Sequence, residues 1–427
     1  MFRRHKTEVL VVGAGPVGLY SALRLADSGV DVEIVDKQWR STGQSYALAL
    51  HPSTLRLLDE AGIVGELIEE GRCVNRIALM GEGKRQAELR FDELPGEFPF
   101  LLVLPQSALE SVLERRLRRA GVRVRWNHRV SRLDTDGRRA VAQVDKLDKV
   151  SVGYAVAAAE WVIQKTFPME AAFVIGADGH GSVVRKASGI EFDSFGEPEL
   201  FAVFEFYSGP KPGHEVRIVL ENGLANVLWQ LPGDRWRWGF QVQEGEVREN
   251  RRAKSPLAVQ IGRGSFPHVE KERLVELIEE RAPWFASPVG DLRWSMAVRF
   301  ERRLARRFGR DNVWLAGDAA HLTGPVGVHS MNVGLHEAED LARGVVEVLR
   351  GELSKGAMES YNRERLSEWR QLLGVEAAFE TGSETSAWVK ENGASILPCL
   401  PASGDDLKRL GSQIGLEMGS RQVAHPS

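Results

Sequence analysis

The strongest constraint on the fold is a glycine-rich turn near the start of the chain. An apolar run from Glu8 to Val12 predicts a buried strand, and Leu19 to Ser28 has the apolar spacing of a helix. Between them lies the sequence Gly13-Ala14-Gly15-Pro16-Val17-Gly18. In such a turn the first glycine permits a sharp bend, the second lets a pyrophosphate approach the backbone, and the third lets the helix pack on the strand. The pattern is typical of a unit that binds an adenine dinucleotide.

An acidic residue at the end of the next strand supports this interpretation. The apolar run from Val30 to Val35 ends in Asp36, which is followed by Lys37. A carboxylate at this position can accept hydrogen bonds from the ribose hydroxyls of adenosine. The motif favours a bound dinucleotide over a turn without a ligand, but it does not separate FAD from NAD.

Two more carboxylates follow apolar runs later in the chain. Asp178 comes after the run from Ala172 to Ile175, and Asp318 comes after the run from Val313 to Ala316. The carboxyl ends of parallel strands meet at one edge of a sheet, so we expect these residues to face a common crevice.

Residues 330 to 341, just beyond Asp318, have helical spacing. Asp318 could bind two hydroxyls of a polyol, and the free N–H groups at the start of that helix could hold an anion. Together they could bind the ribityl chain and the N1/O2 edge of a flavin. The alternative is a strand–loop–helix crossover with a solvated carboxylate.

Residues 192 to 299 have a different pattern. Segments from 201 to 242 alternate like antiparallel strands and are joined by turns such as Asn222-Gly223. Trp236, Trp238 and Phe240 share one face, which is more typical of a core than of a ligand wall. A further strand is expected from Val122 to Trp126.

Composition excludes several classes of protein. The formal net charge of −3 and the pI near 6.4 argue against nucleic acid as a partner. Two cysteines cannot build a disulfide framework, and no metal-binding cluster is expected. No run approaches the roughly 20 apolar residues of a membrane helix. We therefore expect a cytoplasmic protein, either a monomer or a homodimer, without an integral membrane segment.

Three stretches together resemble a known family. They read GAGPVG, GADGHGSVVRKASGI and GDAAHLTGP…MNVGLHEAEDLA, and they span residues 7 to about 350. In order and spacing they are similar to the signatures of the single-component (group A) FAD-dependent aromatic hydroxylases, whose fold is that of p-hydroxybenzoate hydroxylase. The resemblance implies an α/β fold, in which a doubly wound FAD-binding domain is interleaved with an antiparallel-sheet substrate domain and followed by C-terminal helices.

The same resemblance implies the domain boundaries. Residues 1–75, 101–190 and 300–350 would form the FAD-binding domain, 76–100 and 191–299 the substrate-binding sheet domain, and 351–427 a C-terminal helical segment. The residues that it implies in FAD binding are Gly13, Gly15, Pro16, Val17, Gly18, Asp36, Lys37, Gln106, Val130, Asp178, Asp318, Pro325, Gly327, Met331 and Asn332. For the last two, the backbone N–H groups are the expected contacts. Pro325 would lie beside the reactive edge of the ring.

The implied chemistry is a monooxygenase reaction. NADPH or NADH would reduce the flavin, O₂ would form a flavin C4a-hydroperoxide, and one oxygen would pass to an aromatic or polyketide-like substrate, as in secondary metabolism. Pro325 and His329 are the catalytic candidates. Tyr207, His214 and His329 are possible bases, and nothing in their spacing ranks them. His329 could also contact flavin or substrate, or be a simple loop residue.

Two positions depart from the family pattern. The family loop usually reads Pro-x-x-Gly-Gln-Gly, whereas this chain has Pro325-Val326-Gly327-Val328-His329-Ser330. The loss of glycine at 330 restricts the backbone and adds a side chain near the ring. Tyr46 stands where the family commonly has an arginine associated with flavin movement or nicotinamide binding.

These departures keep other functions open. A reductase or dehydrogenase of the same fold, acting on C=C bonds without oxygen, is one alternative. A non-catalytic FAD-binding partner is another. A flavin-dependent halogenase is disfavoured, because Gly239-Phe240 follows Trp236-Arg237-Trp238 where Ile-Pro would be expected.

Overall fold

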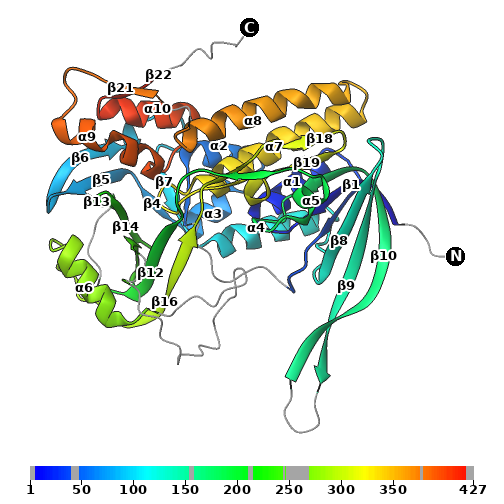
Figure 1. Cartoon of the computed structure of the whole chain (residues 1–427), viewed down its shortest axis with the longest axis horizontal. Helices are drawn as coiled ribbons and strands as arrows, with labels where there is room; N and C mark the ends of the chain where they lie inside the picture. The colour runs from blue at the N-terminus through cyan, green and yellow to red at the C-terminus, as the bar shows by residue number, and fades with distance from the viewer. Residues whose placement is uncertain are drawn as a thin grey trace.

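The computed structural model describes residues 5–39, 48–152, 158–209, 215–243, 246, 269–375 and 378–419. Over these ranges a mixed sheet with parallel central strands and a large, mainly antiparallel sheet lie side by side, and helices pack around both (Figure 1). This arrangement confirms the predicted α/β fold class.

The parallel sheet is organised around the strand that precedes the glycine-rich turn. Its strands run in the order β18 (Gly309–Arg310), β19 (Val313–Leu315), β10 (Ala158–Gly176), β1 (His5–Val12) and β2 (Val32–Val35). The last four pair in parallel. Their carboxyl ends therefore share one edge of the sheet, and that edge carries Gly13, Asp36, Asp178 and Asp318, as the sequence predicted.

Helices complete the core of this half of the molecule. α1 (Pro16–Asp27) contacts both α4 (Gln106–Arg119) and α7 (His329–Leu349), and α8 (Glu359–Leu372) contacts α7. Val9, Leu10 and Val11 of β1 are fully buried beneath them. Burying apolar area stabilises the folded state by about 25 cal/mol per Å². The packing of these helices on β1 therefore stabilises the position of the strand ends that carry the acidic residues.

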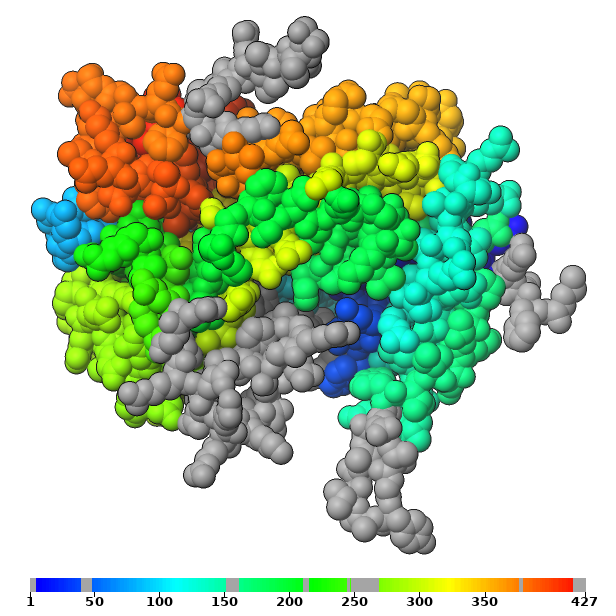
Figure 2. Space-filling model, viewed as in Figure 1, coloured from blue at the N-terminus to red at the C-terminus, as the bar shows by residue number. Residues whose placement is uncertain are grey.

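Two further strands, β8 (His128–Thr135) and β9 (Ala140–Val152), extend the same sheet from β10. They pair antiparallel, and β9 pairs with β10 to form a long hairpin that projects from the body (Figures 1 and 2). The expected strand from Val122 to Trp126 is wrong. Only Arg125 forms a bridge, to Val35, because the chain turns at Asn127, where φ is +60°.

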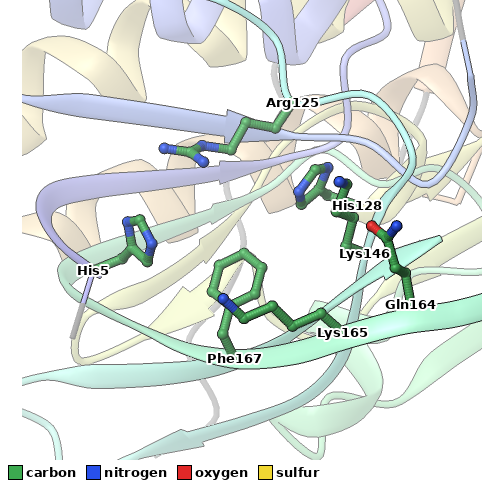
Figure 3. A pocket seen from close by; sticks show the side chains of 7 residues that line it. All are labelled: His5, Arg125, His128, Lys146, Gln164, Lys165 and Phe167. Atoms are coloured by element: carbon green, nitrogen blue, oxygen red, sulfur yellow. The ribbon is translucent and has the colours of Figure 1, made fainter. Parts of the chain in front are cut away.

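A pocket of about 560 Å³ lies where strands β8, β9 and β10 face the start of β1. Phe167 lies between His5 and His128, at ring-centroid distances of 5.2 Å and 6.0 Å (Figure 3). Lys146, Lys165 and Arg125 give the lining a cationic character. None of the predicted flavin-site residues lines this pocket.

The large antiparallel sheet forms the other half of the molecule. Its strands run in the order β16 (Leu292–Phe300), β12 (Glu199–Tyr207), β15 (Arg235–Val242), β14 (Leu224–Gln230), β13 (Glu215–Glu221), β5 (Arg76–Gly81) and β6 (Lys84–Arg90). Only the β13–β5 pair among them is parallel within the described residues. Both faces are apolar, so two separate cores flank the sheet.

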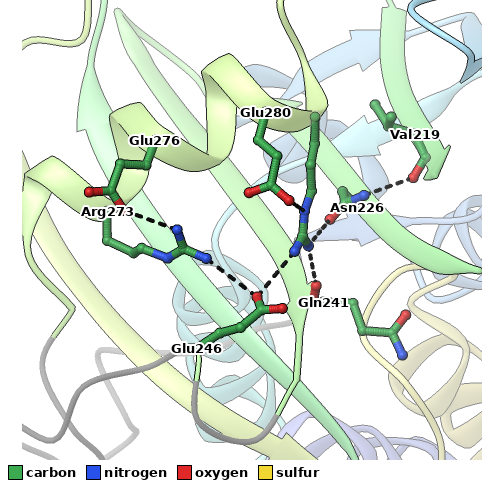
Figure 4. Close-up of polar contacts among 8 residues, drawn as sticks. Val219, Asn226, Gln241, Glu246, Arg273, Glu276 and Glu280 are labelled. Carbon is green, nitrogen blue, oxygen red and sulfur yellow. Dashed lines mark hydrogen bonds and ion pairs between the residues drawn. The ribbon is translucent and has the colours of Figure 1, made fainter. Parts of the chain in front are cut away.

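The face with Trp236, Trp238 and Phe240 is a core under α6 (Lys271–Arg281). A buried arginine, Arg281, attaches the helix to the sheet. Its guanidinium donates to the Gln241 carbonyl and forms an ion pair with Glu246 at 3.1 Å (Figure 4). The two tryptophans are therefore part of the hydrophobic interior, as expected for a core rather than a ligand wall.

Smaller elements join the two halves. One small sheet contains β3 (Ala49–Leu50), β7 (Leu101–Val103) and β4 (Arg72–Val74), and another contains β11 (Phe192–Ser194), β17 (Arg303–Ala305) and β20 (His321–Leu322). The remaining helices include α2 (Pro52–Glu60), α3 (Val64–Glu70) and α5 (Val183–Ala187).

The C-terminal segment closes one end of the molecule. It contains α9 (Ala387–Ile396), α10 (Gly404–Gln413) and a hairpin of β21 (Ala378–Thr381) with β22 (Leu416–Gly419). α9 and α10 contact β6, so this segment lies against the corner formed by β5 and β6 (Figure 2). Among the described helices, none combines the length and apolar character needed to cross a membrane.

Candidate flavin site

The glycine-rich turn leaves space at one position only. Gly13 has φ +104°, and a Cβ there would lie 2.2 Å from the Ala177 carbonyl oxygen. A Cβ at Gly18 would lie 2.0 Å from the Gly13 carbonyl oxygen. A Cβ at Gly15, in contrast, would meet no atom within 4 Å. The outer glycines are thus required for packing, while the middle one borders open space at the start of α1, where a pyrophosphate would approach.

Asp36 is held beside this turn by the backbone. Its carboxylate accepts hydrogen bonds from the N–H groups of Ala14 and Gln38, both at 2.7 Å. An ionised carboxylate has about four lone-pair sites, so acceptor capacity remains for ribose hydroxyls. Lys37, the next residue, is exposed. Val130 is buried in β8, where it pairs with Val144.

Gln106 begins α4 and donates to Glu110 at 2.7 Å. The other oxygen of the Glu110 carboxyl, Oε2, is buried and has no hydrogen-bond partner. Burial raises the pKa of Glu110 to about 7, and the negative charge of Asp36 adds to this shift. An orphaned buried oxygen beside Gln106 and Asp36 fits a site at which a polar cofactor supplies the missing partner.

Asp178 serves the protein itself. It accepts hydrogen bonds from the Ser182 hydroxyl at 2.6 Å and from the N–H groups of Val183 at 2.6 Å and Val184 at 3.3 Å. These donors lie at the start of α5, so the carboxylate satisfies the free end of that helix. Desolvation raises its pKa, although the three hydrogen bonds oppose the shift.

Asp318 lies in a one-turn 3₁₀ helix, Gly317–Ala319, that follows β19 at the carboxyl edge of the parallel sheet. It is exposed, and desolvation by the surrounding protein raises the pKa of its carboxyl. His321, His180 and a hydrogen bond from the Ser330 hydroxyl favour the charged form. The residue that replaces the family glycine thus contacts the carboxylate expected to bind the ribityl chain.

The start of α7 lies beside Asp318, because Ser330 in its first turn hydrogen-bonds to that carboxylate. The first N–H groups of a helix have no partner within it, and the aligned peptides give this end roughly half a positive charge. The Asn332 side chain is occupied by the protein: its oxygen accepts from the His51 N–H at 2.8 Å, and its amide donates to the carbonyls of Ala49 and Val328. Met331 is largely buried. The Asn332 side chain is therefore not available to a ligand, and an anion contact through the backbone N–H groups of Met331 and Asn332 stays a prediction.

The loop before α7 is held from behind. The Gly327 carbonyl accepts from His51 Nε2 at 3.0 Å, and a Cβ at Gly327 would lie 2.5 Å from the Pro398 carbonyl oxygen. Val328 has φ +51°, an unusual value for a β-branched residue. Pro325, earlier in the same loop, is partly exposed.

His329 is a structural residue rather than a base. Its ring is 1% exposed, and Nε2–H donates to the Leu400 carbonyl at 2.8 Å. Burial lowers the pKa of the imidazole to about 4. This placement contradicts a catalytic role, because the ring is occupied in joining the loop to the C-terminal segment. Of the other possible bases, Tyr207 is exposed at the far end of β12, whereas His214, like Tyr46, lies outside the described residues.

One functional residue was missed by sequence reasoning. Glu337 is fully buried on α7. Its Oε2 accepts from the Gly317 N–H at 2.8 Å and from His321 Nε2 at 2.9 Å, and its Oε1 accepts from Trp369 Nε1 at 2.6 Å. It therefore supports the turn that carries Asp318. The sequence did contain one signal for this residue: Glu337 is an acidic residue on the otherwise apolar face of the helix that begins near residue 330.

A sequence profile described as "FAD binding domain" matches residues 6–374. The chain belongs to this FAD-binding family. FAD is therefore the cofactor expected at the carboxyl edge of the parallel sheet, and the donors and acceptors described above suit its phosphates, ribose and ribityl chain. Within the described ranges, no group of three His, Cys, Asp or Glu residues could hold a metal ion.

Named relatives of this FAD-binding chain are monooxygenases. It is 28% identical over 361 residues to an uncharacterized aromatic compound monooxygenase of Bacillus subtilis (strain 168), covering 84% of this chain and 65% of the relative. It is 27% identical over 394 residues to para-nitrophenol 4-monooxygenase of Pseudomonas sp. (strain WBC-3), covering 90% and 87%. The chain spans from 60% to 65% of the length of three such relatives.

The fold agrees with solved structures. The crystal structure of p-nitrophenol 4-monooxygenase from Pseudomonas putida DLL-E4 superposes with a TM-score of 0.70 at 22% identity, covering 96% of this chain and 97% of that one. At this identity the likeness establishes the arrangement of the two sheets and not the reaction.

Proposed function

We propose that this chain is an FAD-dependent monooxygenase that uses NADPH or NADH and O₂ to hydroxylate an aromatic or polycyclic small molecule. The observation that carries the proposal is the convergence on one sheet edge of the glycine-rich turn, Asp36, the exposed Asp318 and the start of α7. Residues 1–75, 101–190 and 300–350 would form the FAD-binding domain, and 76–100 with 191–299 the substrate domain, followed by a helical segment over 351–427.

Each part of the edge has a role toward the cofactor. Gly15 would admit the pyrophosphate, Asp36 would bind the adenosine ribose, and Asp318 would bind the ribityl hydroxyls. The backbone N–H groups of Met331 and Asn332 would stabilise negative charge at the N1/O2 edge, because both residues lie in the first turn of a 21-residue helix, whose N-terminus carries a partial positive charge. Bound flavin supplies the redox chemistry with O₂, while the chain orients it and excludes water.

The loop before α7 packs against the large sheet. Val326 and Val328 belong to the same apolar core as Phe201, Val203 and Trp229, and Phe300 is partly buried against it. Sites for small ligands are lined mainly by apolar side chains, so we propose that the aromatic substrate binds where this core meets the loop.

The test follows flavin reduction without oxygen. The protein is loaded with FAD, mixed with NADPH or NADH, and challenged anaerobically with a panel of phenols and polycyclic aromatics. Bleaching of the yellow flavin that one compound accelerates, followed by O₂ consumption and a hydroxylated product, is the expected result. Reduction of a substrate C=C bond without O₂ would favour a reductase. A flavin that neither nicotinamide bleaches would favour a non-catalytic FAD-binding partner.

A further inference from the structure

The pocket between the strands β8 to β10 and the start of β1 is separate from the residues assigned to the flavin. Its volume is about 560 Å³, and the side chains that line it come from four segments of the chain (Figure 3). Sites for small organic ligands commonly enclose roughly 300–1,000 Å³. The space therefore suits a ligand of nucleotide size and is much larger than a single inorganic anion needs.

A row of basic side chains crosses three strands at this pocket. In the register of the sheet, Lys146 on β9 lies directly opposite His128 on β8 and Lys165 on β10. Side chains in such positions have Cβ atoms about 5 Å apart, and like charges placed there repel each other. Neither lysine side chain forms an ion pair with any described residue. The protein therefore leaves the repulsion between the two lysines uncompensated, and a bound anion would relieve it.

The rest of the lining adds no negative charge. Arg125 is neutralised by Glu33, which accepts hydrogen bonds from its Nε and Nη2 at 2.6 Å and 2.7 Å. The side chains that line the pocket include no Asp or Glu. Burial lowers the pKa of His128, and the positive charges of Arg125 and Lys146 lower it further. The pocket thus has a positive potential that its own residues do not balance.

An irregularity in β10 brings one more polar side chain to the pocket. Ile163 pairs with Leu147 and Lys165 pairs with Lys146, so Gln164 has no partner in the register. Successive side chains of a regular strand point to opposite faces, whereas a bulge can redirect one of them. Gln164 and Lys165 accordingly both line the pocket. Bulges of this kind are frequent beside functional sites, where they re-aim a side chain.

Three rings lie beside the lysines. Phe167 packs between His5 and His128, with ring-centroid distances of 5.2 Å and 6.0 Å. The ammonium group of Lys165 lies 5.8 Å from the centroid of the Phe167 ring. Aromatic side chains bind nucleobases by stacking, which every base permits because each has a flat face. The pocket therefore places aromatic surface next to a site for negative charge.

We propose that this pocket binds a nucleotide other than FAD, with a phosphate group between Lys146 and Lys165 and the base against Phe167. A phosphate monoester carries a charge of about −1.5 to −2 at pH 7, which matches the two lysines. Lysine binds phosphate as a point charge, so two ammonium groups on adjacent strands can share one phosphate. The nucleotide is either free in solution or the adenosine phosphate part of NADPH, and the experiment distinguishes the two.

The experiment is a calorimetric titration of the oxidised, FAD-saturated protein, in which the flavin site is already occupied. The probes are 5′-AMP, adenosine 2′,5′-bisphosphate and inorganic phosphate. We expect both nucleotides to bind more tightly than inorganic phosphate, because only they reach the rings. Their affinity should fall as salt is added, since the lysines are exposed and their charges are screened.

The decisive variants are Lys146→Gln and Lys165→Gln, with Lys149→Gln as the matched control. Lys149 is an exposed lysine on the same strand as Lys146, and it does not line the pocket. Each pocket variant should weaken AMP binding by roughly tenfold, and the control by less than about twofold. Phe167→Leu should weaken the binding of AMP but not of inorganic phosphate. Thermal unfolding and FAD content establish that the variants are folded.

The source of the nucleotide is determined from flavin reduction by NADPH. If the lysine variants require more NADPH for half-maximal reduction, the ligand is the adenosine phosphate of NADPH. If they reduce the flavin as the wild type does but bind AMP weakly, the ligand is a free nucleotide.

Four results would overturn the inference: no AMP binding to the wild type, unchanged AMP binding in both lysine variants, an equal loss in Lys149→Gln, or inorganic phosphate that binds as tightly as AMP. Failure of the proposed function is a separate result. A protein whose flavin is never reduced would lose the monooxygenase assignment, while the AMP titration would still decide what the pocket binds.

Discussion

At the scale of single residues, two glycines of the turn, Gly15 and Gly18, give different predictions. Alanine at Gly15 fits the open space, and φ there is −74°, so the free energy of unfolding of the apoprotein should change by less than about 0.5 kcal/mol. FAD binding should weaken by roughly tenfold or more, which is about 1.4 kcal/mol. Alanine at Gly18 must displace the Gly13 carbonyl and should lower stability by about 1–3 kcal/mol.

Urea unfolding of the apoprotein and titration of FAD fluorescence measure the two quantities. A Gly15→Ala variant that loses stability and keeps its FAD affinity would place the pyrophosphate elsewhere.

His329 makes a prediction about pH. Its pKa is about 4 in the folded protein and about 6.5 when unfolded, so the unfolded state binds the extra proton between these values. Stability from this residue is therefore complete above about pH 6.5 and is lost as the pH falls toward 4, by about 1.4 kcal/mol per pH unit. His51 has a pKa shifted in the same direction by burial.

In a His329→Gln variant, the unfolded state no longer binds a proton at this position. Between pH 6.5 and 5, the wild type should lose about 2 kcal/mol more than His329→Gln, as measured by denaturant unfolding at each pH. If the free energy of unfolding of the two proteins changed equally with pH, the His329 ring would have the same pKa in the folded and unfolded states, and the prediction would be wrong.

At the scale of elements, Glu337 joins three of them: the turn after β19, helix α7 and helix α8. Alanine at this position would leave three buried donors without an acceptor, including the N–H of Gly317. We expect a loss of about 3–5 kcal/mol in the free energy of unfolding.

Because Gly317 precedes Asp318, FAD affinity should fall in the same Glu337→Ala variant. Glu347→Ala, farther along α7, is the control. Within the described residues the Glu347 side chain has no hydrogen bond or ion pair to lose. Unfolding curves and FAD titrations decide the matter, and a Glu337→Ala protein with normal FAD affinity would mean that the turn is held by its backbone alone.

Elements with a short-range signal could be predicted from the sequence, and those defined by distant partners could not. The glycine-rich turn, the strand before it and the acid at the end of β2 follow from local spacing, and the structure contains them. The run from Val122 to Trp126 has the composition of a strand but forms a single bridge, because Asn127 turns the chain toward β8. His329 and Glu337 could not be assigned, since their partners lie in the C-terminal segment and in α8.

At the scale of the whole molecule, the C-terminal segment is part of the core on one face of the large antiparallel sheet. The family profile ends at residue 374, yet Leu400, Leu407 and Leu410 belong to the core cluster that contains Val326 and Val328. The Leu400 carbonyl also holds His329. The segment thus supports the flavin-facing loop from behind, although it lies beyond the region that defines the family.

This arrangement predicts that packing in the C-terminal segment controls the flavin site. Leu400→Ala should lower the free energy of unfolding by about 2–5 kcal/mol, because the side chain is fully buried, whereas Leu353→Ala, at a site 42% exposed, should change it little. The cavity left by the missing Leu400 side chain would lie behind the loop that precedes α7. FAD affinity should therefore fall together with the free energy of unfolding. Denaturant unfolding and FAD titration of both variants measure this. If Leu400→Ala unfolds more easily but binds FAD as tightly as the wild type, the loop keeps its shape without the segment, and the two halves of the molecule are energetically separate.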